Sequence, residues 1–247
     1  MGSALTSLPP PLLERLRAAK RVVALTGAGI SAESGVPTFR DAQTGLWARF
    51  TAEELATPEA FLENPRRVWD WYAWRRQLTR EAQPNPGHLA LVELARRYPE
   101  FSLVTQNVDG LHARAGSRDV IELHGNIELD LCFDEGTPVS EYADDGSVPP
   151  HCPRCGAYVR PGVVWFGEAL PRRALERAEA AVRACDVVLS IGTSGLVHPA
   201  AGLPLIAQQS GALLVEINPN ATPLTPHAQH VLSGPAGEVL PELVRAL

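Results

Sequence analysis

One stretch of the sequence carries most of the information on its fold: Val22-Val-Ala-Leu-Thr-Gly-Ala-Gly-Ile-Ser-Ala32. A short apolar run leads here into a glycine-rich turn with the spacing G-x-G-x-x-A. That arrangement is typical of dinucleotide sites, because glycines allow a tight turn and bring backbone amides close to a pyrophosphate. A glycine turn also forms without a ligand, so the stretch by itself predicts a strand and a turn, with a phosphate site as one interpretation.

Further apolar runs follow along the chain at residues 101–105, 187–191 and 213–217. Like 22–26, they are almost continuously apolar, as expected for a parallel sheet covered on both faces. The intervening segments 87–97, 172–184, 199–210 and 238–246 have the composition of helices. Alternation of strand and helix predicts an α/β fold with a doubly wound, Rossmann-like parallel sheet.

Two stretches interrupt this alternation. Residues 38–85 contain four of the five tryptophans and no convincing strand, whereas residues 126–162 are acidic, loop-like and enclose three of the four cysteines. We therefore expect a nucleotide-binding domain made of residues 1–37, 86–125 and 163–247. The small domain would combine a helical insertion, 38–85, with a zinc-ribbon-like module, 126–162.

Composition excludes several classes of protein. The chain has 247 residues, 45% of them hydrophobic, and a formal net charge of −6. This charge argues against a dedicated nucleic-acid binder, whose binding surface is normally basic. No apolar run approaches the roughly 18–20 residues that span a bilayer, and the start lacks the pattern of a signal peptide. We expect a cytoplasmic protein that does not contact membranes, with Cys185 as a buried structural thiol.

Polar residues follow the predicted strands at the edge where parallel sheets bind ligands. They are Gln106, Asn107 and Asp109 after 101–105, Gly192, Thr193 and Ser194 after 187–191, and Asn218 after 213–217. An acidic ribose anchor at the end of a second strand is missing, because Glu53 and Glu54 lie in a helical context. The pattern thus favours a nucleotide site and disfavours a hydride-transferring dehydrogenase.

At this point the chain resembles the sirtuin (Sir2) family of NAD-dependent protein-lysine deacylases. The matching segments occur in the family's order at 27–40, 105–112, 123–125, 163–168 and 192–194. The resemblance implies that NAD contacts three groups of residues: Gly27, Ala28, Gly29, Phe39 and Arg40 at the diphosphate and ribose; Gln106, Asn107 and Asp109 at nicotinamide; Gly192, Thr193, Ser194, Asn218 and Ala236 at the adenosine half.

The resemblance also implies a reaction. His124, which alone would more often be a structural histidine, matches the family's general base and would act with Asn107 and Asp109. It would take a proton from the ribose hydroxyls after the acyl oxygen attacks C1′ and expels nicotinamide. The products would be free lysine, nicotinamide and O-acyl-ADP-ribose. A non-catalytic sensor of NAD or ADP-ribose is the alternative from another class, and ADP-ribosyl transfer is a minor activity of the same chemistry.

Substrate recognition is implied by two further segments. An acyl-lysine protein or peptide would add as a strand to Val163, Val164, Trp165, Phe166 and Gly167. The stretch 65–78 is expected to be a helix, in which Trp69 and Trp74 belong to an aromatic core stripe.

Tyr72 and Arg75 are neighbours at i, i+3 on that helix, and together they offer a hydroxyl and a charged fork to a carboxylate. They match the pair of the sirtuin class that removes succinyl and malonyl groups, and Ala56 matches its small residue. Acidic acyl groups are therefore the expected substrates, and general deacetylation is the alternative.

The metal site departs from the family's pattern of two CxxC pairs. Cys152 and Cys155 form one complete pair, but Cys132 has Glu135 where the second thiolate would stand. Zinc accepts carboxylate ligands, so a site completed by Glu135, by His151 or by water stays open, and so does loss of the metal. The sequence makes no prediction of the oligomeric state.

Overall fold

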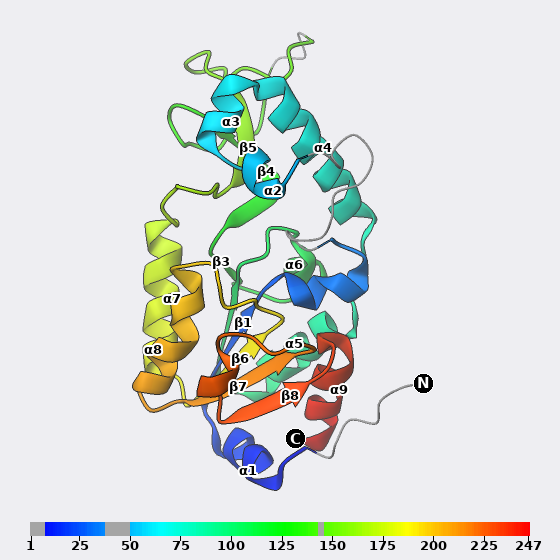
Figure 1. The fold of residues 1–247 in the computed structure, drawn as a ribbon, viewed down its shortest axis with the longest axis vertical. Coiled ribbons are helices and arrows are strands. Elements are labelled where there is room, and N and C mark those ends of the chain that lie inside the picture. The colour runs from blue at the N-terminus through cyan, green and yellow to red at the C-terminus, as the bar shows by residue number, and fades with distance from the viewer. Residues whose placement is uncertain (1–7, 38–49, 143–145) are drawn as a thin grey trace.

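A six-stranded parallel sheet forms the centre of the protein in a computed structural model that describes residues 8–37, 50–142 and 146–247. The strands lie in the order β3–β2–β1–β6–β7–β8 (Figure 1). The order reverses between β1 and β6, which is the position where doubly wound sheets bind their ligands. The predicted fold class is confirmed.

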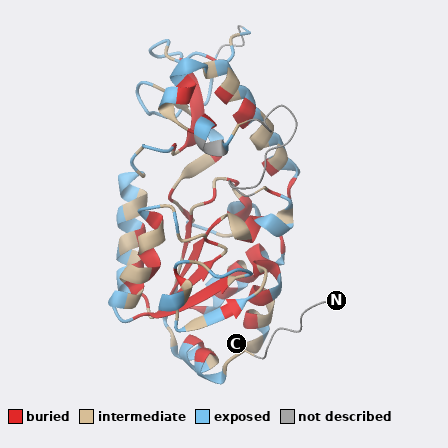
Figure 2. Cartoon of the chain, viewed as in Figure 1, coloured by how far each residue is buried: buried red, intermediate tan, exposed pale blue. Residues whose placement is uncertain are grey.

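The four predicted strands are present, and two short ones were not foreseen. The sheet consists of β1 (Arg21–Thr26), β2 (Glu100–Thr105), β3 (Ile121–Glu122), β6 (Val187–Ile191), β7 (Leu213–Asn218) and β8 (His230–Ser233). All five residues of β6 are buried, which explains its continuous apolar pattern (Figure 2). β3 has only two residues and β8 is a short edge strand, so neither shows a usable periodicity.

Helices cover both faces of this sheet. On one face α1 (Pro10–Ala18), α5 (Pro86–Arg97) and α9 (Ala236–Ala246) pack in one buried cluster with residues of the strands. On the other face α7 (Arg172–Ala184) and α8 (Leu203–Gln209) pack in a second cluster. Cys185 is 7% exposed at the end of α7, as predicted, and burial raises the pKa of its thiol to about 11.

Four of the five predicted helices have other bounds in the structure. α5 begins one residue earlier, at Pro86, and the helix predicted at 65–78 extends to Glu81. The stretch 199–210 is divided into a 3₁₀ turn, Ala200–Gly202, and α8. α9 begins at Ala236, two residues before the predicted start, although glycine and proline there favour a turn. The Glu33 carboxylate accepts a hydrogen bond from the Gly237 amide at 2.7 Å, so a residue far away in sequence stabilises the first turn of the helix.

A smaller unit lies beyond one end of the large sheet (Figure 1). It contains α2 (Ala52–Leu55), α3 (Pro58–Glu63), α4 (Pro65–Glu81) and the antiparallel pair β4 (Gly125–Cys132) and β5 (Val159–Val163). The expectation that 126–162 is loop-like is wrong at these two strands. The register of β4 shifts between Gly125 and Asp130, and Leu129 is 55% exposed. Period-two alternation is therefore lost in the sequence.

Within the smaller unit, Trp71 is fully buried, whereas Trp69 and Trp74 are only partly buried at the margins of two apolar clusters. The core position of the predicted aromatic stripe is thus Trp71. The boundaries proposed for the two domains stay a prediction. No helix within the described residues is both long enough and apolar enough to cross a membrane.

Candidate functional site

The polar residues singled out in the sequence come together at one edge of the large sheet. β1 leads to Gly27, β2 to Gln106, β3 to His124 and β6 to Gly192, and β7 ends at Asn218. Since all these strands are parallel, their carboxyl ends meet at the same edge. The candidate site is therefore assembled from segments that are far apart along the chain.

Two glycine turns pack backbone to backbone at the centre of this edge. The Gly27 amide donates to the Ile191 carbonyl at 3.0 Å, and the Gly29 amide donates to the Gly192 carbonyl at 2.9 Å. A Cβ on Gly29 would lie 2.7 Å from the Gly192 Cα, so side chains are sterically excluded. After the turn the chain forms a 3₁₀ helix, Ala28–Ser34, instead of the α-helix of a dehydrogenase.

The adenosine-side residues predicted from the sequence adjoin these turns. Asn218 donates from Nδ2 to the Thr193 carbonyl at 2.8 Å, and the Thr193 hydroxyl lies 3.1 Å from that of Ser190. Ser194 is half-buried, and Ala236 is buried at the start of α9. Phe39 and Arg40 lie outside the described residues. The amides, hydroxyls and small residues at this switch point fit a nucleotide.

Asn107 and Asp109 are held by a residue that the sequence analysis did not single out. The Ser31 hydroxyl donates to Asp109 Oδ2 at 2.7 Å and lies 3.1 Å from Asn107 Nδ2. Asp109 Oδ1 also accepts from the Leu111 amide at 2.9 Å. Both side chains are more than nine-tenths buried, so this network fixes them before any ligand arrives. Ser31 lies within the glycine-rich motif, and this position is the feature of the sequence that could have identified it.

Two buried histidines extend this network. His88 Nε2 lies 3.5 Å from the Ser31 hydroxyl, and His112 Nε2 lies 2.9 Å from that of Thr26. Their rings are 4.9 Å apart. Burial lowers the pKa of His112 to about 3, with His88 as a second cause, and burial also lowers the pKa of His88. Both rings are therefore neutral at pH 7.

His124 has the geometry of a general base. Its Nδ1 lies 2.9 Å from the Gln106 carbonyl, which can only accept, so Nδ1 carries the proton of the neutral ring. Nε2 then keeps its lone pair. Burial lowers the pKa of His124, while the bond to Gln106 opposes this shift. Unprotonated Nε2 is the form that accepts protons at neutral pH.

The backbone of the predicted peptide-binding segment, 163–167, donates hydrogen bonds to residues of other segments. The Val164 amide donates to the His124 carbonyl at 2.9 Å, and the Phe166 amide donates to the Ala56 carbonyl at 2.9 Å. The Trp165 amide donates to Glu168 at 2.7 Å. These three consecutive amides thus already donate hydrogen bonds within the protein. A peptide that adds as a strand would therefore bond to carbonyl oxygens of this segment, or to backbone groups from Gly167 onward.

Tyr72 and Ala56 lie in one buried apolar cluster together with Val163 and Trp165. The Tyr72 hydroxyl accepts from Trp165 Nε1 at 3.0 Å. Arg75, one turn along α4, is half-buried with its guanidinium 5.2 Å from the Trp71 ring centroid. Burial lowers the pKa of Arg75, and the neighbouring Tyr72 and Asp109 oppose this shift. Tyr72 thus belongs to the apolar cluster, and Arg75 lies beside it in contact with the Trp71 ring.

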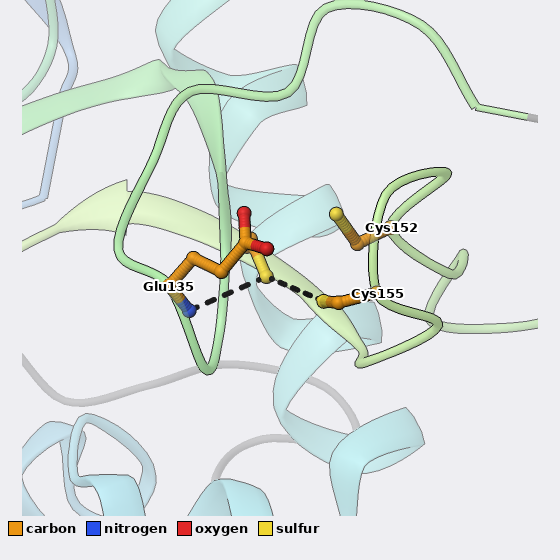
Figure 3. A group of neighbouring side chains, drawn as sticks. Glu135, Cys152 and Cys155 are labelled. Carbon is orange, nitrogen blue, oxygen red and sulfur yellow. Dashed lines mark hydrogen bonds between the residues drawn. The ribbon is translucent and has the colours of Figure 1, made fainter.

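The cysteine group has the composition of a metal site. Ligand atoms of Cys132, Glu135, Cys152 and Cys155 lie within 4.8 Å of one another, and Figure 3 shows the Glu135 carboxylate beside the two labelled thiols. A tetrahedral zinc with Zn–S bonds of about 2.3 Å spaces its sulfurs about 3.8 Å apart, so the group fits zinc. His151 is not among the residues whose ligand atoms lie within this distance of one another.

The surroundings of Glu135 leave one carboxylate oxygen for a metal. Arg154 Nε and the Thr137 hydroxyl both donate to Oε2, each at 3.0 Å. Hydrogen bonds of this kind orient ligands in metal sites. The described geometry thus favours Glu135 over His151 as the fourth ligand among the alternatives left open by the sequence.

Comparison with known proteins gives matches along almost the whole chain. The model of the Sir2 family matches residues 27–199. A protein of Pseudomonas aeruginosa named NAD-dependent protein deacylase 1 is 52% identical over 95% of this chain and 97% of its own length. One of Archaeoglobus fulgidus with the same name is 52% identical over 95% and 96% of the two chains.

Solved structures agree with these relatives. A crystal structure of a Sir2 homologue in complex with NAD has a TM-score of 0.90 and 49% identity, and covers 99% of this chain and 95% of its own. A Sir2 complex with a p53 peptide and NAD⁺ has a TM-score of 0.84 and 32% identity, and covers 96% of this chain and 97% of its own. These neighbours were solved with a nucleotide and with a peptide.

Proposed function

The chain belongs to the Sir2 family, and from this premise we propose that it is an NAD-dependent protein deacylase that prefers succinyl- and malonyl-lysine to acetyl-lysine. The first part follows the names of relatives that share half of its residues over nearly its whole length. The acyl preference rests on the residues of this chain. Bound NAD would supply the electrophilic ribose carbon.

The residues around the sheet edge support turnover of NAD. The carboxamide of Asn107 and the carboxylate of Asp109 are pre-positioned by Ser31, as a pocket for a nicotinamide amide requires. His124 Nε2 would accept the proton released from a ribose hydroxyl, and the Gln106 carbonyl would stabilise the positive ring that results. A sensor would need none of this acid–base geometry.

One observation carries the acyl preference: Tyr72 and Arg75 lie on one face of α4 beside the same buried cluster as Ala56 and the peptide segment. A carboxylate entering this cluster would meet a hydroxyl donor and a guanidinium fork, which compensate for its lost hydration. An acetyl group lacks this distal carboxylate. The small side chain of Ala56 leaves room for a longer acyl chain.

Steady-state kinetics with NAD test the proposal on one peptide carrying acetyl-, succinyl- or malonyl-lysine. We expect a higher kcat/KM for the two acidic acyl groups. Arg75→Met should lower the ratio of succinyl to acetyl kcat/KM by about 10- to 100-fold, the loss expected for a charge-assisted hydrogen bond.

Arg66→Met is the matched control, because Arg66 lies on the same helix with a side chain that is 73% exposed. An unchanged ratio is expected there. Equal losses for both substrates in Arg75→Met would leave general deacetylation as the function. Absence of nicotinamide release from all three peptides would indicate a sensor.

We also propose a structural zinc held by Cys132, Cys152, Cys155 and Glu135, which would tie the β4–β5 hairpin to the loop that carries the complete CxxC pair. Elemental analysis of the purified protein should give about one zinc per chain. Glu135→Gln should lower that content, whereas His151→Ala should not. A zinc content near zero in the untreated protein would refute the site.

A further inference from the structure

The Tyr72 hydroxyl has a hydrogen-bond partner within the protein. Trp165 Nε1 donates a hydrogen bond to Tyr72 Oη at 3.0 Å, and both side chains are almost fully buried, at 2% and 3% exposure. An indole N–H is a donor only, so the phenol oxygen must accept from it. The phenol proton of Tyr72 is then left to be donated to a different acceptor.

Trp165 itself is held in place from two directions. The Arg160 guanidinium lies 3.4 Å from the centroid of the indole, and Phe61 packs against it at a centroid distance of 5.3 Å. Arg160 is in turn fixed by hydrogen bonds to Glu168 at 2.9 Å and to the Val163 carbonyl at 2.8 Å. The indole therefore has little freedom to turn its N–H away from Tyr72.

This arrangement favours a neutral phenol that donates. Burial raises the pKa of Tyr72, although the Arg75 guanidinium and the Trp165 indole oppose this shift, so the hydroxyl keeps its proton at neutral pH. A hydroxyl that accepts one hydrogen bond becomes a better donor in the next, because hydrogen bonds in a chain polarise one another. A carboxylate beside Arg75 is an acceptor of the required kind.

We propose that the Trp165 side chain is a positioning residue for acidic acyl groups: its indole N–H occupies the Tyr72 oxygen and directs the phenol proton toward the acyl carboxylate. This role is distinct from the main-chain contacts that the peptide segment offers. The inference rests on the proposed function, since it presupposes that Tyr72 recognises the acyl carboxylate.

A double-mutant cycle tests the inference through the ratio of succinyl to acetyl kcat/KM. Trp165→Phe, which keeps an aromatic ring but loses the N–H, should lower this ratio by about 3- to 10-fold. In the background of Tyr72→Phe, the same substitution should change the ratio by less than about 2-fold. Phe61→Leu is the control, because it loosens the packing around the indole and keeps its N–H.

The possible outcomes distinguish a failure of this inference from a failure of the proposed function. A wild-type enzyme that does not favour succinyl-lysine would overturn the proposed acyl preference. An unchanged ratio in Tyr72→Phe would overturn the role of Tyr72 on which this inference rests. A lower ratio in Tyr72→Phe, together with an unchanged ratio in Trp165→Phe, would overturn the inference alone. An equal fall in Phe61→Leu and Trp165→Phe would also overturn it, by assigning the effect to packing.

A second measurement does not depend on activity. In the indole region of a ¹⁵N–¹H NMR spectrum, the Trp165 signal is assigned by its loss in Trp165→Phe. Tyr72→Phe should shift that signal toward higher field, because the acceptor oxygen is gone. A succinyl-lysine peptide should shift it more than an acetyl-lysine peptide does. A Trp165 indole signal whose position is unchanged in Tyr72→Phe would refute the hydrogen bond between the two residues.

Discussion

Gly192→Ala tests most directly the packing of the two glycine turns at the centre of the site. Gly192 has a φ of 58°, a conformation that costs an L-residue about 1–2 kcal/mol. Its Cβ would lie 2.6 Å from the Ile30 nitrogen and 2.7 Å from the Gly29 carbonyl carbon, both backbone atoms. Overpacking of this kind adds about 1–3 kcal/mol, so the expected loss of unfolding free energy is about 2–5 kcal/mol.

The matched control is Gly195→Ala in the same loop. Gly195 has a φ of 67°, but the nearest atom to its Cβ would be 3.8 Å away, so only the conformational cost of about 1–2 kcal/mol applies. Urea unfolding of both variants gives the difference, and each kcal/mol lowers Tm by about 2–4 °C at this chain length. An equal loss in the two variants would refute the argument that contact between the turns requires Gly192.

Three further predictions concern protonation and metal. Burial lowers the pKa of His124, and the activity should be lost as the pH falls through that pKa. In a pH profile of kcat/KM for nicotinamide release, the acid limb should therefore have its midpoint below pH 6.5. A midpoint above pH 6.5 would contradict the assignment of His124 as the general base. Chelation of zinc should lower Tm in the wild type and have little effect in Glu135→Gln, as differential scanning fluorimetry can show. Backbone amides of Arg21 and Lys20 hold the pKa of Asp186 below its usual value, so this carboxylate stabilises the protein above pH 4 and the benefit is lost as pH falls through the lowered pKa. Asp186→Asn should therefore be less stable at pH 7 by about 1 kcal/mol at most, since the side chain is partly exposed, and the gap should narrow on acidification to pH 3.

The large sheet could be predicted from sequence because its strands are buried on both faces. β1, β2, β6 and β7 have continuous apolar runs, and α7 was predicted with its observed bounds. The misses depend on tertiary contacts. The early start of α9 is stabilised by Glu33 from another segment, and the irregular register of β4 removes the alternation that would have indicated a strand.

The candidate site was predictable at the level of motifs and not at the level of contacts. The sequence indicated Asn107, Asp109 and His124, because polar residues after apolar strands stand out. It gave no reason to join Ser31 with His88, since the two are brought together only by folding. The bond between Trp165 and Tyr72 likewise joins a residue of α4 to one in the segment that follows β5.

The order of strands in the sheet has a consequence for synthesis of the protein. β1 is translated early and pairs with β2, but its other neighbour, β6, leaves the ribosome only after most of the chain has been made. Until then one edge of an apolar strand lacks its partner, which is the state most prone to non-native pairing. Nascent chains released before Val187 should therefore aggregate or be retained by chaperones, whereas chains released after β7 should already close the centre of the sheet.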